Sequence, residues 1–577
     1  MENDKAKSAM SAAAFPDSQH TEHSDSDAPQ SNADSLNSLL QNRDEDSRDD
    51  KCVDVECLEN QCSLNCEDGG TGSQRRAVCC SPVSQVVLGC LLVLVSVGSF
   101  VFSPLDFMLW EKLNMRPGFP PYEWWRDPPD EVRLRVHVFN VTNHERWLAG
   151  VDQKIDVEEI GPIVYLEKLV HSDVQFNDND TLTYTATRYP IYLPDENRID
   201  LNATIIVPNL AVLGLASYLH NAPFFVRSGF RFLVNSRGSP LFVEKTIYEY
   251  LWEFTDPVLD LSKSLAPGLV PVSNMGMLAR IYADFVDQMT VWVGPRWGHE
   301  RFFQIHRFRG HPQLPGYDAN ECPDRITGST EGVMYRQHLT KQDVLLYWRK
   351  TVCKLMPLYF DTELVVDDVP VYRYNLSEVV FSRVRNGTDC YDTEPSLPAG
   401  VSDASKCYYD FPMVISYPHF YTGEPARDRY VTGLQPNRDK HSSYVIVEPL
   451  TGTPFRSVAR MQSNLRIHDL SGFSSEYDKF SNLILPLFWA EYNQEGLPDY
   501  IRLTIYYMVV VLPPVSKALL SFFLLCGCYL IAKQIYTHKL KSERLSATLP
   551  FKNKNVNNLA RNKLFNYEKE TFLKKPS

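Results

Sequence analysis

The sequence lacks the excess of positive charge that proteins binding nucleic acids usually carry. Its 577 residues include 58 Lys and Arg against 71 Asp and Glu, which gives a formal net charge of −13. This balance excludes a general nucleic-acid-binding role, because binding to phosphates requires a basic surface. The chain also lacks the G-x-S-x-G, H-E-x-x-H, P-loop and Rossmann glycine motifs of common enzymes. We therefore expect no catalytic residues and no cofactor, and we favour a receptor or carrier over an enzyme.

Charged residues are missing from two stretches that are apolar enough to cross a membrane. No Asp, Glu, Lys or Arg lies within residues 77–105, and roughly 20 apolar residues suffice for a membrane helix. The sequence predicts transmembrane segments at residues 83–105 and 509–531. The second contains two prolines and Lys517, whose long side chain we expect to reach the headgroups. A mean hydropathy of −0.27 excludes a protein with many spans.

Basic residues flank the outer ends of the two segments. Arg75 and Arg76 precede the first, and basic residues also follow the second. Because positive charge marks the cytosolic side, we expect both termini, residues 1–82 and 532–577, to be cytosolic, and residues 106–508 to form the ectodomain. The first segment begins far from the N-terminus behind an acidic tail, so we interpret it as an uncleaved anchor.

Five Asn-x-Ser/Thr sequons lie between the two segments, and neither tail contains one. N-glycosylation acceptors belong to surface loops of secreted or luminal regions, so this clustering supports a luminal or extracellular middle. The predicted glycosylated residues are Asn140, Asn179, Asn202, Asn375 and Asn386.

A third uncharged stretch, residues 201–226, is long enough to span a membrane, but we reject it as a span. It contains Pro208, His220 and Pro223, and a third span would place the two basic flanks on opposite sides of the membrane. We expect a largely buried helical segment of the ectodomain instead.

The two tails differ in composition. Residues 1–74 are rich in Ser, Asp, Glu, Asn and Gln and poor in aromatic residues, which predicts disorder because little apolar area can be buried. The C-terminal tail is basic, and its charge suits attraction to an anionic inner leaflet, with solvated disorder as the alternative.

Nine of the thirteen cysteines lie in the tails or the predicted spans, and cytosolic thiols stay reduced. Their closeness to the membrane makes some of them candidates for palmitoylation. The candidates are Cys79, Cys80, Cys526 and Cys528. Four cysteines further upstream lack the paired spacing of structural zinc sites, so we expect no metal there: Cys52, Cys57, Cys62 and Cys66.

The ectodomain keeps only Cys322, Cys353, Cys390 and Cys407, an even number on the oxidising side of the membrane. Two disulfides are therefore expected. The spacing of the cysteines alone leaves three pairings open.

Strand patterns dominate the start of the ectodomain. Apolar and polar residues alternate over residues 132–138, which is typical of a half-buried strand. β-Branched and aromatic residues fill three further runs, at residues 163–169, 181–193 and 444–447. A large β-rich domain is predicted, interrupted near residues 205–260 by a helical insert with apolar residues at helical spacing.

Within this insert, residues 222–242 contain arginines and phenylalanines but no Asp or Glu. Such a patch on an acidic protein predicts a docking surface, where Arg attracts anionic groups and Phe makes apolar contacts. The alternative is an ordinary amphipathic helix whose Phe side chains belong to the core. The candidate ligand-binding residues are Phe224, Phe225, Arg227, Phe230, Arg231, Phe232 and Arg237.

A second basic stretch, residues 296–311, contains His299, His306 and His311. The spacing of these histidines matches no standard metal site, so we expect no metal here either. The alternation of polar residues predicts a solvent-facing strand.

Short motifs follow one another along the ectodomain: Val138-Phe-Asn-Val-Thr-Asn143, Glu159-Ile-Gly-Pro162, Ile206-Val-Pro-Asn-Leu210, Leu251-Trp252 with Asp256-Pro257, Val369-Pro-Val-Tyr-Arg373, Ser416-Tyr-Pro-His-Phe420 and Val447-Glu-Pro-Leu-Thr-Gly452. Together with two spans and two cytosolic tails, they resemble the class B scavenger receptor family, which includes the fatty-acid translocase, the high-density-lipoprotein receptor and lysosomal integral membrane protein type two. The resemblance covers residues 82–537, and the long N-terminal tail departs from the family pattern.

The resemblance implies an α+β membrane protein anchored by two transmembrane helices. Its ectodomain would be a large antiparallel β-barrel-like structure with an apical helical bundle and an internal hydrophobic tunnel toward the outer leaflet. Ligands would dock on the bundle, with residues 224–235 on its ligand-binding helix. The family's cysteine order implies the disulfides Cys322–Cys390 and Cys353–Cys407. Some members carry a fatty-acid-reactive lysine just beyond this helix, but Ser236, Arg237 and Gly238 stand here, so lysine-specific chemistry is not expected.

The resemblance further implies a receptor that binds lipids, lipoproteins or lipid carriers at the helical patch and moves apolar cargo through the tunnel to the membrane. One alternative is an endolysosomal trafficking receptor for a luminal protein, and another is a phagocytic or sensory recognition receptor. Neither tail carries a clear sorting signal, so we expect residence in the plasma membrane, with endosomes and lysosomes as the alternative.

Overall fold

The computed structural model describes residues 82–548, except 130, 269, 284–285, 318–321, 383–389, 393–395 and 424–430. From Val86 onward the described chain forms one structural unit. Nearly all of the predicted N-terminal tail lies outside the described residues, with Cys79 and Cys80. The last part of the C-terminal tail and the sequon at Asn386 also lie outside them.

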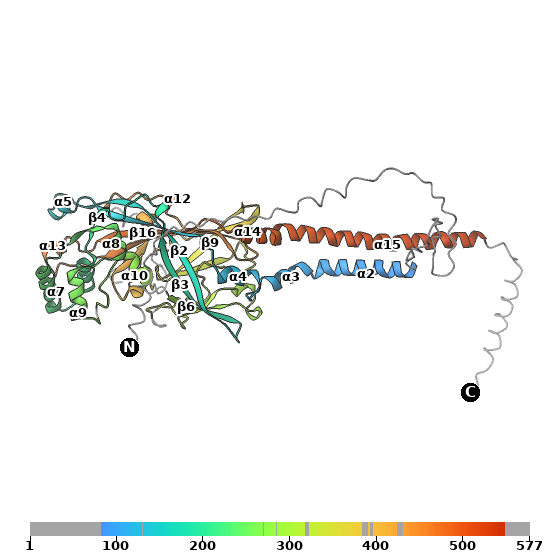
Figure 1. The fold of residues 1–577 in the computed structure, drawn as a ribbon, viewed down its shortest axis with the longest axis horizontal. Coiled ribbons are helices and arrows are strands. Elements are labelled where there is room, and N and C mark those ends of the chain that lie inside the picture. The colour runs from blue at the N-terminus through green and yellow to red at the C-terminus, as the bar shows by residue number, and fades with distance from the viewer. Residues whose placement is uncertain are drawn as a thin grey trace, which may run out of the picture. The chain divides into compact units, whose positions relative to one another are not determined.

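A 14-stranded sheet forms the framework of the ectodomain (Figure 1). The runs predicted as strands at residues 132–138, 163–169, 181–193 and 444–447 form strands. The strands are β1 (Val132–Val141), β2 (Ile155–Asn177), β3 (Thr181–Tyr192), β6 (Val286–Trp292), β7 (Ile305–Phe308), β8 (Val344–Arg349), β9 (Lys354–Val366), β10 (Val369–Leu376), β11 (Val401–Asp403), β12 (Met413–Ser416), β13 (Val431–Thr432), β14 (Tyr444–Val447), β15 (Pro454–Arg466) and β16 (Ile484–Gln494), with β4 (Thr204–Pro208) and β5 (Phe242–Thr246) in a separate pair.

The main path of the sheet runs β7-β6-β3-β2-β1-β16-β15-β14-β10-β9-β8, and its neighbouring strands are antiparallel. Strand β12 pairs with β11 and β15, and β13 pairs with β2 in parallel. The central β1–β16 pair therefore joins residues from both ends of the ectodomain.

Residues 328–330 connect the two edge strands of this path, β7 and β8. The Ile305 N–H donates to Ser329 O at 2.7 Å, and the Thr330 N–H donates to Leu346 O at 2.8 Å. One short segment thus pairs backbone groups of both edges, which would otherwise be exposed. The closed barrel that the resemblance implies stays a prediction.

Helices gather at one end of the sheet and at the two ends of the described chain. Figure 1 shows α7, α9 and α13 at the end of the sheet opposite to α14. The helices are α2 (Pro82–Val101), α3 (Pro104–Lys112), α4 (Pro120–Arg126), α5 (His144–Leu148), α6 (Leu215–Tyr218), α7 (Phe224–Arg237), α8 (Ile247–Trp252), α9 (Pro257–Leu265), α10 (Met277–Ala283), α12 (Arg438–His441), α13 (Ser475–Asp478), α14 (Asp499–Tyr506) and α15 (Leu512–Thr548).

The uncharged stretch 201–226 is buried and helical only in part, since it begins with β4 and ends in exposed residues of α7. Residues 210–217 form a π-helical turn followed by α6, and all of them are buried in the core beneath the helices. The uncharged side chains of residues 210–217 therefore face protein, whereas Phe224 and Phe225 at the end of the stretch are exposed. The stretch is not one of the candidate membrane helices of the described chain.

The strand predicted for residues 296–311 is wrong for most of its length. Only β7 is a strand, and two 3₁₀ turns, at Pro295–Trp297 and His299–Arg301, precede it. Pro295 and Gly298, which has a positive φ of 68°, interrupt the extended backbone. Phe302 and Phe303 are buried, so this region also does not face solvent throughout.

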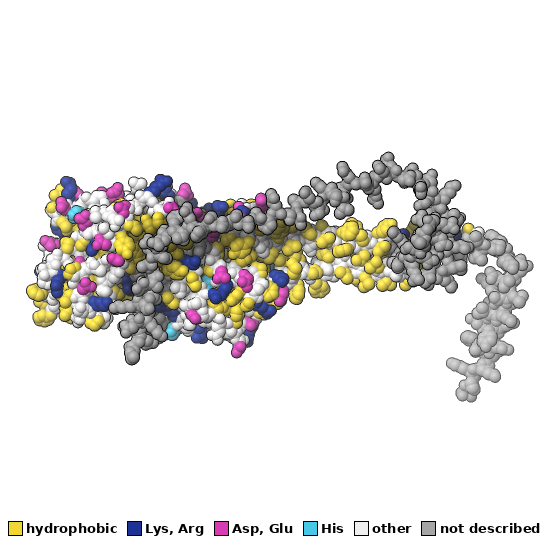
Figure 2. Space-filling view, viewed as in Figure 1, with side chains coloured by type: hydrophobic (Ala, Val, Ile, Leu, Met, Phe, Trp, Pro, Cys, Tyr) yellow, Lys and Arg dark blue, Asp and Glu magenta, His cyan; other side chains and the backbone are white. Residues whose placement is uncertain are grey.

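Two described helices are long and apolar enough to cross a membrane: α2, with 20 residues, and a continuous helix of 46 residues from Asp499 to Arg544. The second comprises α14, the π-helical turn η7 (Tyr507–Val511) and α15 as far as Arg544. Two prolines follow this turn directly, and they remove backbone N–H donors at the place where the helix widens. Because no Pro or Gly interrupts residues 528–548, the helix continues past residue 531. Figure 2 shows mostly hydrophobic side chains over α2 and α15.

Helices α2 and α15 meet at two glycines. A Cβ atom on Gly89 would lie 3.0 Å from Gly527 O, and one on Gly527 would lie 2.8 Å from Gly89 O. Small residues permit such close approach of membrane helices. Leu109 of α3 and Ile505 of α14 are buried with Val371 of β10 in one apolar cluster, which anchors both helices to the sheet.

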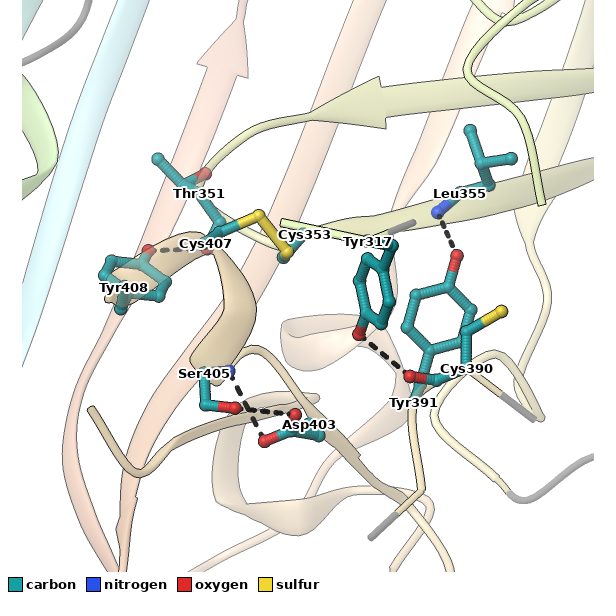
Figure 3. The surroundings of a disulfide bond; sticks show 10 residues. All are labelled: Tyr317, Thr351, Cys353, Leu355, Cys390, Tyr391, Asp403, Ser405, Cys407 and Tyr408. Carbon is teal, nitrogen blue, oxygen red and sulfur yellow. Dashed lines mark hydrogen bonds between the residues drawn. A yellow bond between two sulfur atoms is a disulfide. The ribbon is translucent and has the colours of Figure 1, made fainter. Parts of the chain in front are cut away.

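Both disulfides implied by the family's cysteine order are present. The Cα atoms lie 5.3 Å apart in Cys322–Cys390 and 5.8 Å apart in Cys353–Cys407. Figure 3 shows the second bond beside Tyr408, whose hydroxyl donates to Thr351 O at 2.7 Å. In the described part of the chain, the one cluster with metal-ligand geometry contains Cys322 and Cys390, and these are bonded to each other, so their thiolates are not available to a metal.

Candidate functional site

Helix α7 carries the residues predicted to bind ligands. Pro223 precedes its first turn, and Gly238 ends it in a left-handed conformation with φ of 64°, which glycine adopts without strain. The Gly238 N–H donates to Asn235 O at 3.3 Å, and the Ser239 N–H donates to Val234 O at 3.4 Å. The C-terminal end of the helix is therefore capped.

The inner face of α7 belongs to the core. Phe230 is only 7% exposed and packs edge-on against Phe473, with ring centroids 6.3 Å apart. Arg227 is half-buried, and its guanidinium lies against Gly472, where an added Cβ atom would collide with it. For Phe230 the alternative interpretation, a core side chain, is thus correct, and Arg227 contributes to packing.

The outer face of α7 presents large apolar side chains to solvent. Phe224 is 66%, Phe225 85% and Phe232 75% exposed, and Arg231 and Arg237 of the same helix are exposed as well. We call these five residues the α7 surface. No acidic residue lies in α7, and Figure 2 shows hydrophobic side chains gathered at the end of the ectodomain where Figure 1 places α7 and α9.

An apolar cavity of about 100 Å³ lies among the helices, and we call it the α9 cavity. Its walls come from α6, α9, α10, the segments around residues 271 and 409, and the inner face of the sheet. Its lining residues include Leu259, Arg280, Tyr408, Ser463 and Phe488.

A larger cavity of about 170 Å³ lies beside α4 and α14, and we call it the α14 cavity. Trp124 and Trp125 of α4 and Ile501 of α14 line it on the side of the membrane helices. Met461 and Tyr492 line it on the sheet. An apolar space thus reaches the place where the ectodomain continues into the second membrane helix.

Buried charges line part of the α14 cavity. Arg349 Nη2 lies 2.6 Å from Glu167 Oε1, and Arg188 Nη2 lies 2.7 Å from Glu331 Oε2. The Tyr184 hydroxyl donates to Glu331 at 2.5 Å. Burial raises the pKa of Glu331, but Arg188 and these hydrogen bonds outweigh burial and hold the pKa below its usual value. The cavity is therefore largely apolar, with one wall formed by ion pairs. The sequence did not predict this wall, because its residues lie far apart in the chain.

A histidine cluster, also missed from the sequence, surrounds Glu159. His137 Nδ1 lies 2.5 Å and His419 Nε2 2.6 Å from the two carboxylate oxygens. Burial raises the pKa of Glu159, but the hydrogen bonds from these histidines lower it well below its usual range. His441 stacks on His419 with ring centroids 4.5 Å apart, and burial lowers the pKa of His441 to about 3. The sequence signals were Glu159 and His419, each within one of the short motifs, at residues 159–162 and 416–420.

The predicted modification sites occupy different environments. Asn179 and Asn202 are exposed in turns, whereas Asn140 and Asn375 are half-buried in strands. Asn140 Oδ1 also accepts the Ile206 N–H at 2.8 Å. The palmitoylation candidates within the described chain have free thiols on α15, half-buried at Cys526 and exposed at Cys528. Modification of all these residues stays a prediction.

Comparison with known proteins identifies one family model and several similar proteins. A model of the CD36 family matches residues 86–538. Scavenger receptor class B member 1 of Sus scrofa is 26% identical over 426 residues, 73% of this chain and 82% of that protein, and its Bos taurus counterpart is 26% identical over 450 residues, 77% and 85%. Lysosome membrane protein 2 of Homo sapiens is 26% identical over 391 residues, 67% and 79%. Because the family model covers well over half of the 577 residues, this chain belongs to the CD36 family.

Proposed function

We propose that this protein is a membrane receptor that binds lipid-carrying particles at the α7 surface and passes apolar lipid through its ectodomain to the membrane, without covalent chemistry. Membership of the CD36 family supports a lipid or lipoprotein receptor role. The observation that carries the proposal is the exposed aromatic and basic face of α7 on an acidic protein.

The α7 surface has the chemistry of a lipid-particle docking site. Phe224, Phe225 and Phe232 keep apolar area in water, and burying such area stabilises a complex by about 25 cal/mol per Å². Arg231 and Arg237 supply charge that anionic lipid headgroups attract. A contiguous exposed apolar patch on a folded domain marks an interaction site.

The route through the ectodomain is proposed from the two cavities. The α9 cavity adjoins the helices that carry the docking surface, and the α14 cavity adjoins the second membrane helix. The hydrogen bonds of residues 328–330 to both edge strands support a closed, barrel-like wall around them. An apolar interior of this kind spares cargo the cost of about 0.8 kcal/mol per CH₂ group in water.

The proposed orientation places both tails in the cytosol and the ectodomain outside or in a lumen. The exposed sequon residues Asn179 and Asn202 support it, since glycans must reach solvent. If it is correct, Asn179→Gln and Asn202→Gln will each remove one glycosidase-sensitive glycan from the mature protein. An unchanged electrophoretic mobility for both variants would argue against it.

A second candidate is a receptor of endosomes or lysosomes that carries a luminal protein. The likeness to lysosome membrane protein 2 favours a lysosomal address. Imaging of the full chain against plasma-membrane and lysosomal markers, followed by recovery of luminal proteins with it, distinguishes this candidate from the first.

The docking proposal is tested with Phe225→Ser/Phe232→Ser in cells that lack related receptors. Binding of fluorescent lipoprotein particles at 4 °C should fall by about a hundredfold or more, because each of the two Phe side chains that leave water contributes roughly 1.5–3 kcal/mol. Val365→Ser/Val379→Ser removes two exposed apolar side chains from the sheet region and is the control. Equal binding by the α7 variant, or equal loss in the control at matched surface levels, contradicts the proposal.

A further inference from the structure

Three side chains form a row across the neighbouring strands β8, β9 and β10. Asn375 of β10 pairs with Tyr359 of β9, and Tyr359 pairs with Val344 of β8. The residues next to them along the strands are buried together in one apolar cluster: Leu345, Leu358 and Leu376. Because successive side chains of a strand point to opposite faces, all three members of the row point to the face of the sheet away from this cluster.

The row is apolar and open to solvent beside Asn375. Tyr359 is 50% and Val344 47% exposed. Leu346 and Pro357, which pair with each other on the same two strands, lie two residues further along on the same face and are half-buried. We call these four residues, Val344, Leu346, Pro357 and Tyr359, the β8–β9 patch. Neighbouring strands lie about 4.8 Å apart, so the patch begins one strand away from Asn375.

Arg373 holds the Asn375 side chain by its oxygen. Arg373 Nε donates to Asn375 Oδ1 at 2.9 Å, and this contact identifies the amide oxygen, since an arginine can only donate. The amide nitrogen, the atom that carries an N-linked glycan, is therefore left for a sugar. On the other side of Asn375, its partner on β14 is Tyr444, and the Arg373 guanidinium lies 4.3 Å from the centroid of the Tyr444 ring. The aromatic ring that stays exposed beside Asn375 is thus the ring of Tyr359.

We propose that an N-linked glycan on Asn375 packs its first sugar on Tyr359 and covers the β8–β9 patch. The occupant of this apolar surface is then a modification of the same chain, because the sequon Asn375-Leu-Ser377 lies in the row itself. The inference goes beyond the proposed function and requires only that the ectodomain lies outside the cell or in a lumen.

A pyranose ring suits this position chemically. One face of the ring carries C–H groups, which are attracted to the negative face of an aromatic ring, while its hydroxyl and acetamide groups can remain in water. Apolar area that leaves water in this way stabilises the folded chain. A glycan is also bulky and hydrophilic, so it keeps an exposed apolar patch from associating with other proteins.

The test compares thermal unfolding of the purified full chain with and without this glycan. Ser377→Ala removes the sequon but leaves Asn375 and its hydrogen bond to Arg373 in place. This variant should lower the midpoint by about 2 °C, the scale of one lost aromatic contact in a large domain. In a Tyr359→Ser background the same change should lower it by about half as much or less, because the sugar has no ring on which to pack. In a Tyr359→Phe background, which keeps the ring, the full loss should remain.

The control is Asn202→Gln, in an exposed turn before β4. Its effect on the midpoint should be the same with Tyr359 as with Tyr359→Ser, because the two sites are independent. An equal loss from Ser377→Ala in both backgrounds overturns the inference.

Peptide mapping of the unsubstituted chain supplies the second readout, and it should find Asn375 glycosylated. An unmodified Asn375 on a chain that is glycosylated at Asn202 overturns this inference and leaves the proposed orientation intact. A chain without a glycan at either residue overturns both.

Discussion

Neighbouring phenylalanines of α7 have opposite roles, although the sequence alone makes them look alike. Phe225 projects into solvent, whereas Phe230 fills the space against Phe473. Helical periodicity separates the two faces once the orientation of the helix is known. At the scale of single residues, burial therefore decides which side chains are available to a ligand.

This difference predicts unequal effects on stability. Phe230→Ala should lower the free energy of unfolding by about 3 kcal/mol, because it leaves a cavity in the core. Phe225→Ala should change it by less than about 0.5 kcal/mol, as exposed positions do. Urea unfolding of the purified full chain in detergent measures both. Similar losses in the two variants would contradict the assignment of the faces.

Buried histidines predict that acid weakens the fold. Burial lowers the pKa of His171 to about 4 and that of His441 to about 3, below an ordinary value near 6.5. The unfolded chain takes up protons that the folded chain refuses, so this contribution to stability is present above pH 6.5 and is lost as the pH falls. Between pH 6.5 and 5 the loss is about 2 kcal/mol for each histidine.

His441→Gln tests this pH dependence. The Asn437 N–H donates to His441 Nδ1 at 3.0 Å, and the amide oxygen of Gln can accept it without titrating. The fall in the free energy of unfolding between pH 7 and pH 5 should be about 2 kcal/mol smaller in the variant. Glu159, with its lowered pKa, contributes stability that is present above its ordinary value of 4.5 and is lost only as the pH falls below that value, outside this range. Equal falls would show that His441 is not the titrating group.

At the scale of elements, the disulfides hold segments that the sheet alone does not fix. Cys353–Cys407 joins the start of β9 to the 3₁₀ turn that ends with Tyr408, as Figure 3 shows. It closes a loop of 54 residues. The bond therefore restricts the unfolded chain and also positions a wall of the α9 cavity.

Removing this bond should destabilise the ectodomain. Cys353→Ala/Cys407→Ala should lower the free energy of unfolding by about 4 kcal/mol according to the loop-entropy relation. Thermal unfolding in detergent, compared with the reduced and the oxidised unsubstituted chain, measures the effect. A variant as stable as the oxidised chain would show that the bond contributes nothing.

The contact between α2 and α15 makes another prediction at this scale. Gly89→Leu should separate the helices, because its side chain would collide with Gly527 O and Ile531. Gly98, on the same helix, has nothing within 4 Å of an added Cβ, so Gly98→Leu is the matched control. The thermal midpoint in detergent should fall by several degrees in the first variant alone. An equal fall in both variants would show that a leucine at any glycine of this helix is destabilising, and it would contradict a specific contact at Gly89.

For the whole molecule, the features that depend on local sequence patterns could be predicted, whereas those that depend on contacts between distant residues could not. Alternation identified β1, β-branched and aromatic content identified β3, and the lack of charge identified both membrane helices, because each signal lies within one short segment. The buried position of residues 210–217 was predicted because the stretch 201–226 contains Pro208, His220 and Pro223 and because a third span would separate the two basic flanks. The wall formed by Glu167 and Arg349 could not be predicted, because it depends on how strands 182 residues apart meet.

The most direct test of the docking account is lipid uptake at 37 °C from lipoprotein particles by cells expressing Arg231→Glu/Arg237→Glu. The exposed pair Arg296→Glu/Arg307→Glu, elsewhere on the ectodomain, carries the same change of charge and serves as the control. At matched surface levels, uptake should fall about tenfold or more in the α7 variant, because reversed charge repels anionic headgroups, and should stay unchanged in the control. Undiminished uptake by the α7 variant would contradict docking at α7.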